Sequence, residues 1–280
     1  NGTLNIYSLV ENKSIGYLNG LGDTRDLVLT YSGKELVVTS RRNGLYIIDI
    51  SNPENPSVIS HYDTLEYATG ISISGDYVFV CSRWFGIEIV DISDLTNPKF
   101  IAKLSGDNEY QDCFVSGEYL YVGVYNGKKV DIWDISTIDC PKKISEISLN
   151  GSGQGLFVEN DYLYAATALN AEGEPQKEEY ACGTGNGLEI YDISNTKRPK
   201  WISTIKTESR YNYNGQDVWD VVVSNGIAYL SNMYGGMFEI DVSDVYNPSI
   251  RSNTQIISQN SNESRIFDQN YLYPFDIVSD

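Results

Sequence analysis

The chain contains one strand-and-turn segment in five copies. Each copy is an apolar strand that ends in an aspartate, and a proline stands seven residues after that aspartate. The repeated aspartates are separated by 42, 43, 58 and 49 residues. A period near 42 residues is typical of the blades of a β-propeller, which take about 40–45 residues each. The five copies are GLYIIDISNPENP (44–56), GIEIVDISDLTNP (86–98), VDIWDISTIDCP (130–141), GLEIYDISNTKRP (187–199) and GMFEIDVSDVYNP (236–248).

Each repeat divides into four strands. The third strand is apolar at neighbouring positions, such as Ile89 and Val90, so both of its faces must be covered. Sheets packed face to face around a ring would cover them. The chain also lacks a long window with helical spacing of apolar residues, so helix should be scarce. In the second repeat the four strands are GISISG (70–75), DYVFVCS (76–82), GIEIVDIS (86–93) and KFIAKLS (99–105).

The two ends of the chain complete the pattern. Residues 3–10 align with a third strand, with Ser8 in place of the aspartate, and residues 11–18 follow as a fourth. Residues 264–276 have the pattern of a first and a second strand. We therefore predict an all-β, six-bladed β-propeller of four-stranded blades, closed by one blade shared between the N- and C-termini. The alternative is a fragment of a longer propeller.

This prediction makes residues 1–280 a single propeller domain. The first residue is Asn rather than Met, which suggests a processed or trimmed product. The predicted blades are 20–62, 67–105, 110–149, 153–206, 215–257 and a composite of 261–280 with 1–19.

The strings LYIIDIS, IEIVDIS and LEIYDIS resemble the LVIVD repeat, a propeller repeat of bacterial and archaeal proteins. The resemblance spans essentially the whole chain. It implies a propeller fold and an exported or cell-surface location, because many members of that family are exported. It implies no particular reaction.

The repeated aspartate and proline are expected to have a structural role in the turn. Asp91 stands near the end of a strand, where its carboxylate can accept backbone N–H groups of the turn that contains Ser93. Pro98 fixes φ where the outer strand begins. A residue that occurs once in every blade, away from the ring axis, does not make a unique site. We therefore assign no catalytic role to these residues.

A unique site is instead expected at the loop face, the end of the blades where the chain enters each first strand and passes from second to third strand. Asp26, Asp112 and Asp220 stand just before first strands and could converge near the ring axis. Carboxylates and carbonyls are the ligands that Ca²⁺ prefers, so these three residues are candidate metal ligands, and calcium is the candidate cofactor. The alternative is three aspartates that are solvated or bonded to backbone.

Aromatic side chains also gather in the predicted loops. Exposed rings beside carboxylates and amides suit a carbohydrate site, in which rings stack on sugar faces. The alternative is that the rings pack between blades. A long insertion, residues 168–186, falls on the same face and is either functional or a plain mobile loop. The candidate ligand-binding residues are Trp84, Tyr110, Tyr211, Tyr213 and Trp219.

Composition disfavours some classes of partner and of catalytic mechanism. A net charge of −18 disfavours nucleic acid and anionic membranes as partners, and no apolar run is long enough to span a membrane. His61 is the only histidine and falls in a predicted outer strand, so Ser-His or Cys-His catalysis has at most one candidate. Of the four cysteines, Cys81 and Cys113 are expected near the loop face, either bridged or as buried thiols.

These observations lead to three hypotheses. The first is a non-enzymatic secreted or cell-surface propeller that binds a protein or glycan through its loop face. The second is a calcium-dependent hydrolase or lyase that acts on carbohydrate at the axial carboxylates. The third is a structural module that contacts its neighbours in an exported assembly.

Overall fold

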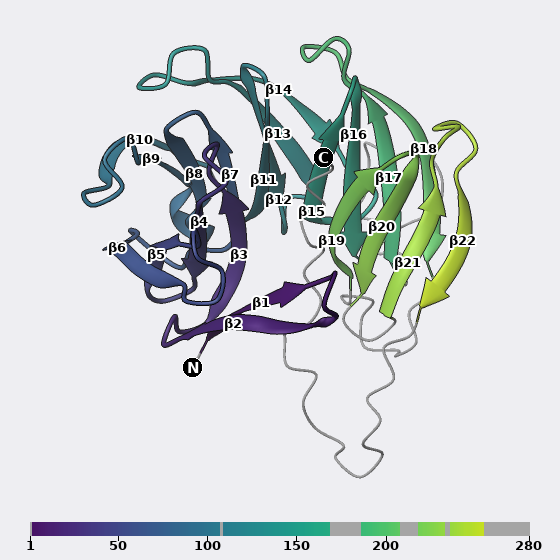
Figure 1. The fold of residues 1–280 in the computed structure, drawn as a ribbon. Helices are drawn as coiled ribbons and strands as arrows, with labels where there is room; N and C mark the ends of the chain where they lie inside the picture. Colours follow the sequence, from purple (N-terminus) through teal and green to yellow (C-terminus); the bar gives the residue numbers. More distant parts are fainter. Residues whose placement is uncertain (1, 107–108, 169–185, 208–217, 233–235, 255–280) are drawn as a thin grey trace. The chain divides into compact units, whose positions relative to one another are not determined.

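A computed structural model describes residues 2–106, 109–168, 186–207, 218–232 and 236–254. Their regular secondary structure consists of β-strands and one short 3-10 helix, η1 (Arg83–Phe85). The predicted all-β class is therefore confirmed (Figure 1). Within the described ranges, no helix is long and apolar enough to cross a lipid bilayer.

The described strands form five four-stranded sheets, each antiparallel where its pairing is described, and one two-stranded sheet. We call the four-stranded sheets blades 1 to 5 in chain order. Blade 1 comprises β3 (Thr24–Leu29), β4 (Glu35–Ser40), β5 (Gly44–Asp49) and β6 (Ser57–Tyr62); blade 2 comprises β7 (Ile71–Ser74), β8 (Tyr77–Cys81), β9 (Ile87–Asp91) and β10 (Lys99–Leu104); blade 3 comprises β11 (Tyr110–Ser116), β12 (Tyr119–Val124), β13 (Lys129–Asp134) and β14 (Lys142–Ser148); blade 4 comprises β15 (Ser152–Glu159), β16 (Tyr162–Ala168), β17 (Asn186–Asp192) and β18 (Lys200–Thr207); and blade 5 comprises β19 (Val218–Ser224), β20 (Ile227–Asn232), β21 (Gly236–Asp241) and β22 (Ser249–Thr254).

The fold is a β-propeller with four-stranded blades, as predicted, but the described residues show five such blades rather than six. The sixth sheet contains only β1 (Thr3–Ser8) and β2 (Lys13–Asn19). Its expected partners, residues 261–280, lie outside the described residues. The shared blade and the closure of the ring therefore stay predictions.

Contacts group the chain into two compact units. Unit 1 contains residues 1–115 and 135–141, and unit 2 contains residues 116–134 and 142–280. In unit 1 an apolar core joins blades 1 and 2, with Leu45, Ile71 and Val80 among its buried residues. In unit 2 a second core joins blades 4 and 5, with Leu188 and Leu230 among its buried residues.

The repeated turns are held by their aspartates. The Asp91 carboxylate accepts the N–H of Ser93 at 2.8 Å, and the Asp192 carboxylate accepts the N–H of Ser194 at 2.9 Å. The side-chain hydroxyl and backbone N–H of Ser194 lower the pKa of Asp192. The expected architectural role of the repeated aspartates is thus confirmed for these turns.

The same turns also dock the preceding blade. The Ser60 hydroxyl on β6 donates to the carbonyl of Leu95 at 2.6 Å, and the Ser203 hydroxyl on β18 donates to the carbonyl of Val245 at 2.6 Å. Each acceptor stands four residues after the repeated aspartate. Each serine lies where the pairing of third and fourth strands shifts register. The turn therefore fastens one blade to the next.

The two-stranded sheet repeats this arrangement. Its register shifts between Ile6 and Tyr7, so Gly16 occupies the position of Ser60 in blade 1. A Cβ atom added to Gly16 would overlap the carbonyl oxygen of Pro53, which stands four residues after Asp49. β1 and β2 thus lie against blade 1 as the third and fourth strands of a blade would.

We expect Ser203→Ala to lower the free energy of unfolding by about 1 kcal/mol, because the buried hydroxyl no longer satisfies the carbonyl of Val245. Urea unfolding of the variant and the wild type measures this difference. Ser249→Ala removes an exposed serine hydroxyl from β22 and is the control. Equal effects of the two substitutions would contradict the docking role of Ser203.

Candidate functional site

The three predicted metal ligands lie inside first strands, in β3, β11 and β19, rather than just before them. Two of them have described bonds to backbone. Asp26 accepts the N–H of Leu27 at 2.8 Å with Oδ1 and the N–H of Ile71, on blade 2, at 3.0 Å with Oδ2. Asp220 accepts the N–H of Val221 at 2.7 Å. At Asp26, both carboxylate oxygens thus hold backbone, and one of these bonds joins neighbouring blades.

Glycine faces aspartate between neighbouring blades. A Cβ atom added to Gly70 would lie 2.6 Å from the Cα atom of Asp112, and one added to Gly155 would lie 2.5 Å from the Cα atom of Asp220. Such distances are too short for a side chain, so glycine permits the close approach of the two strands. This packing explains the glycines at positions 70 and 155, each of which faces an aspartate of the following blade.

Within the residues that the structure describes, no group of three His, Cys, Asp or Glu side chains is placed to hold a metal ion. Asp26 and Asp112 belong to unit 1, whereas Asp220 belongs to unit 2. The three-carboxylate calcium site therefore stays a prediction.

The predicted ligand-binding aromatics have different environments. Trp84 lies in η1 and is 52% exposed, whereas Tyr110 is buried at the start of β11 with its hydroxyl beside Gly106. Trp219 is partly buried in β19, and its Nε1 atom has no hydrogen-bond partner in the part of the chain that the structure describes. Tyr211 and Tyr213, like most of the insertion at 168–186, lie outside the described residues. Of the five aromatics, only Trp84 is described on the surface.

Trp84 belongs to a larger exposed surface in unit 1. Its neighbour Phe85 is 44% exposed, and Leu65, in the loop between β6 and β7, is 51% exposed. The Glu66 carboxylate accepts the N–H of Trp84 at 2.9 Å, so the two loops are joined. The Lys103 ammonium lies 4.0 Å from the centre of the Phe85 ring. We call Leu65, Trp84 and Phe85 the aromatic loop surface.

A buried glutamate holds the loops that carry this surface. Glu88 lies in β9 and is fully buried. Its carboxylate accepts the N–H of Leu65 at 2.7 Å and the hydroxyl of Ser82. Glu88 therefore holds the backbone at Leu65 and the side chain of Ser82, two residues before Trp84, from the core of blade 2.

Blade 4 contains a buried glutamate at the same position. Glu189 occupies the position of Glu88, three residues before the repeated aspartate, and is also fully buried. Its carboxylate accepts the N–H of Asn150 at 2.9 Å and the hydroxyl of Tyr191 at 2.6 Å. Burial raises the pKa of Glu189, although the bonds from Tyr191 and Asn150 act in the opposite direction.

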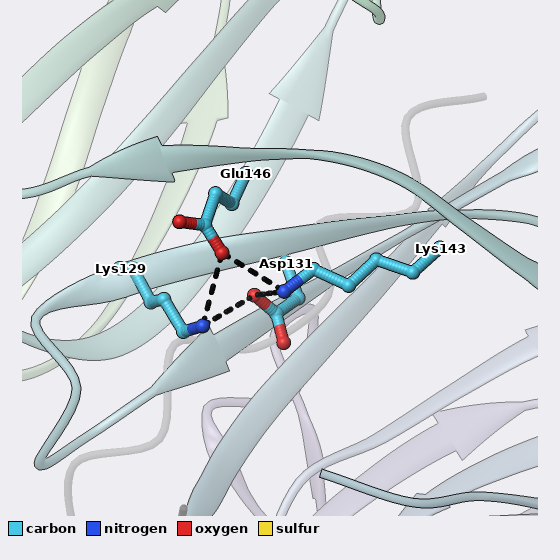
Figure 2. Close-up of polar contacts among 4 residues, drawn as sticks. All are labelled: Lys129, Asp131, Lys143 and Glu146. Atoms are coloured by element: carbon cyan, nitrogen blue, oxygen red, sulfur yellow. Dashed lines mark hydrogen bonds and ion pairs between the residues drawn. The ribbon is translucent and has the colours of Figure 1, made fainter. Parts of the chain in front are cut away.

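Blade 3 carries an aspartate, Asp131, at this position, and pairs it with lysines (Figure 2). Lys143 Nζ lies 2.7 Å from Asp131 Oδ1, and Lys129 Nζ lies 3.3 Å from it. Both ammonium groups also contact Glu146, at 2.9 and 3.0 Å. Burial alone would lower the pKa of Lys143, but hydrogen bonds to Asp131 and Glu146 raise it to about 12. The two lysines thus compensate the buried charge.

These buried acids were not among the predicted site residues. Their signal is an acidic residue inside an otherwise apolar strand, as in GIEIVD and GLEIYD. The prediction for His61 was correct in its placement: this residue lies in β6, the outer strand of blade 1, and its ring contacts that of Tyr46. His61 is therefore in no described contact with the aromatic loop surface.

Comparison with known families decides which repeat this is. The model of the LVIVD repeat matches residues 21–64, 66–104, 109–138, 177–207 and 215–255. The chain belongs to the LVIVD-repeat family. One matched segment falls in each of the five blades, and the predicted resemblance is confirmed. A search of curated proteins found no match for this LVIVD-repeat chain.

Solved structures share the fold of the LVIVD-repeat chain at low sequence identity. A functionally unknown protein from Desulfotomaculum acetoxidans is 14% identical, with a TM-score of 0.69 over 90% of this chain and 75% of its own. A protein from Lactobacillus plantarum is 11% identical, with a TM-score of 0.72 over 89% of this chain and 76% of its own. A hypothetical selenium-binding protein from Sulfolobus tokodaii is 15% identical, with a TM-score of 0.66 over 85% and 66%. These likenesses show the fold alone.

We expect Asp26→Ala to lower the free energy of unfolding by about 1–3 kcal/mol in the presence of a chelator, because two backbone N–H groups lose their acceptor. Chemical unfolding in EDTA and in millimolar calcium measures this loss. A loss that appears only with calcium would instead support a bound ion.

Glu189 should make stability depend on pH. Because its pKa is raised in the folded protein, the stability that it contributes is present below its unfolded pKa of about 4.3 and is lost as the pH rises through the folded value. Glu189→Gln cannot ionise, so the wild type should lose stability relative to this variant as the pH rises. Glu118→Gln, in an exposed turn, controls for the removal of a charge.

Urea unfolding of all three proteins between about pH 4 and pH 8 measures this dependence. If the difference in unfolding free energy between the wild type and Glu189→Gln stays constant over that pH range, the prediction is contradicted.

Proposed function

We propose that this LVIVD-repeat protein is a non-enzymatic binding module that recognises a protein partner through the aromatic loop surface. The observation that carries the proposal is the exposure of Leu65, Trp84 and Phe85 on loops whose backbone is bonded to Glu66 and to the buried Glu88. Tryptophan and other aromatic side chains are enriched at protein interfaces. A surface that is rigid before binding loses little conformational entropy on association.

The apolar character of the surface favours a protein over a glycan. A carbohydrate site needs polar groups that bond sugar hydroxyls beside the stacking ring. Here the carboxylates of Glu66 and Glu88 are already bonded to backbone N–H groups, and Leu65 adds an aliphatic side chain. Recognition of a glycan remains the alternative, and a purely structural role in an exported assembly is the other.

The proposal includes a six-bladed ring and a location outside the cell or on its surface. The sixth blade is supported by β1 and β2, which have the register shift of a third and fourth strand and pack Gly16 against Pro53. The location rests on the family resemblance alone. A calcium-dependent hydrolase draws no support from the bonds that Asp26 and Asp220 make to backbone.

Paired variants test the binding surface. Trp84→Ala/Phe85→Ala removes both rings, and Tyr31→Ala removes an 81%-exposed ring from the turn between β3 and β4, at the opposite end of the strands. We expect a protein from the cell-surface fraction of the source cells to bind to the wild type and to the Tyr31→Ala variant. The double variant should bind it roughly tenfold more weakly or worse. Equal retention by all three would contradict the proposal.

The same three proteins on a glycan array separate the alternatives. Binding to a glycan that only the double variant loses would replace the protein partner with a carbohydrate. A blank array together with equal retention would favour the structural module.

A further inference from the structure

Two cysteines on neighbouring blades lie on adjoining strands inside unit 1. Cys81 ends β8 of blade 2, and Cys113 lies in β11 of blade 3. Both are present as thiols, and they are 0% and 3% exposed. The Cys113 thiol donates to the carbonyl of Phe79, two residues before Cys81 on β8, at 3.5 Å, so the Cys113 sulfur lies beside the end of β8 that carries Cys81.

The backbone around the two thiols is fixed from both blades. The N–H of Cys81 donates to the carbonyl of Gly70 at 2.9 Å, and the N–H of Gly70 donates to the carbonyl of Gln111 at 3.0 Å. Gly70 is therefore bonded both to the strand that ends in Cys81 and to the strand that contains Cys113. This arrangement holds together the two strands that carry Cys81 and Cys113 in the folded state.

We propose that Cys81 and Cys113 form a disulfide between blades 2 and 3 when the chain folds in an oxidising environment. Two S–H bonds break and one S–S bond forms. A low-molecular-weight disulfide such as oxidised glutathione accepts the two electrons and two protons and leaves as two thiols. The present structure is the reduced form of this pair.

Burial determines when the bond can form. Thiol–disulfide exchange needs a thiolate that the oxidant can reach. In the folded unit the two thiols are enclosed, and burial raises the pKa of both. Oxidation therefore takes place during folding, before β11 packs against blade 2, and the finished bond is then protected from reductants.

Cys140 provides an internal control, because it is exposed in the turn after β13. Cys182 lies outside the described residues. The inference does not depend on the aromatic loop surface, so a failure of either proposal leaves the other standing.

Refolding in a defined redox buffer tests the pair. Wild-type protein is reduced, unfolded, and refolded with reduced and oxidised glutathione. Thiols are then alkylated under denaturing, non-reducing conditions, and the digest is analysed by mass spectrometry. We expect a peptide pair linked through Cys81 and Cys113, with Cys140 alkylated. Alkylation of both Cys81 and Cys113 in the refolded protein, or their pairing with Cys140 or Cys182, would overturn the inference.

Variants and melting give a second readout. Cys81→Ser and Cys113→Ser should each abolish the linked peptide, whereas Cys140→Ser should keep it. Because a disulfide restricts the unfolded chain, the oxidised wild type should melt on the order of 5 °C above the reduced protein. The wild-type comparison needs no substitution, so it decides the question even where a variant fails to fold. Equal melting temperatures of the oxidised and reduced wild type would also count against the bond.

Discussion

Burial of both faces of the third strand is the constraint on which the whole fold depends. Ile47 and Ile48 point to opposite faces of blade 1, and both are at most 1% exposed. A single sheet cannot cover both of its own faces, so each blade needs a neighbour on either side. The repeated turn supplies one contact to such a neighbour, since its carbonyl accepts a serine hydroxyl from the preceding blade. The repeat therefore encodes the interface between blades as well as the blade.

A carboxylate inside such a strand is costly unless it finds partners, and its partners connect the core to the loops. Glu88 and Glu189 accept N–H groups of the loops that precede their blades. Asp131 has two lysines instead. Because a buried carboxylate needs hydrogen-bond donors, it fixes the backbone of the loop that supplies them. At blade 2 the backbone that is fixed carries Leu65, a member of the aromatic loop surface.

The sequence predicts what is local and leaves open what depends on partners far along the chain. The blades, the turns and the bonding of Asp91 could be predicted because period and spacing determine them. The partner of Asp26 could not, since the N–H of Ile71 comes from the next blade. Trp84 and Tyr110 are both aromatic residues of the predicted loops, yet one is exposed and the other is buried. Only the packing around each ring distinguishes them.

The two ends of the blades differ in the chemistry that they leave available. At the turn end, the repeated aspartates bond to backbone of their own turns, so those carboxylates are committed to the fold. At the loop end, the position three residues before the repeated aspartate varies between acid and aromatic, as in Glu88 and Phe238. Each choice changes how the neighbouring loop is held. A fold built this way can vary its loops blade by blade while the turns keep the contacts between neighbouring blades, so the described blades differ most in chemistry at the loop end.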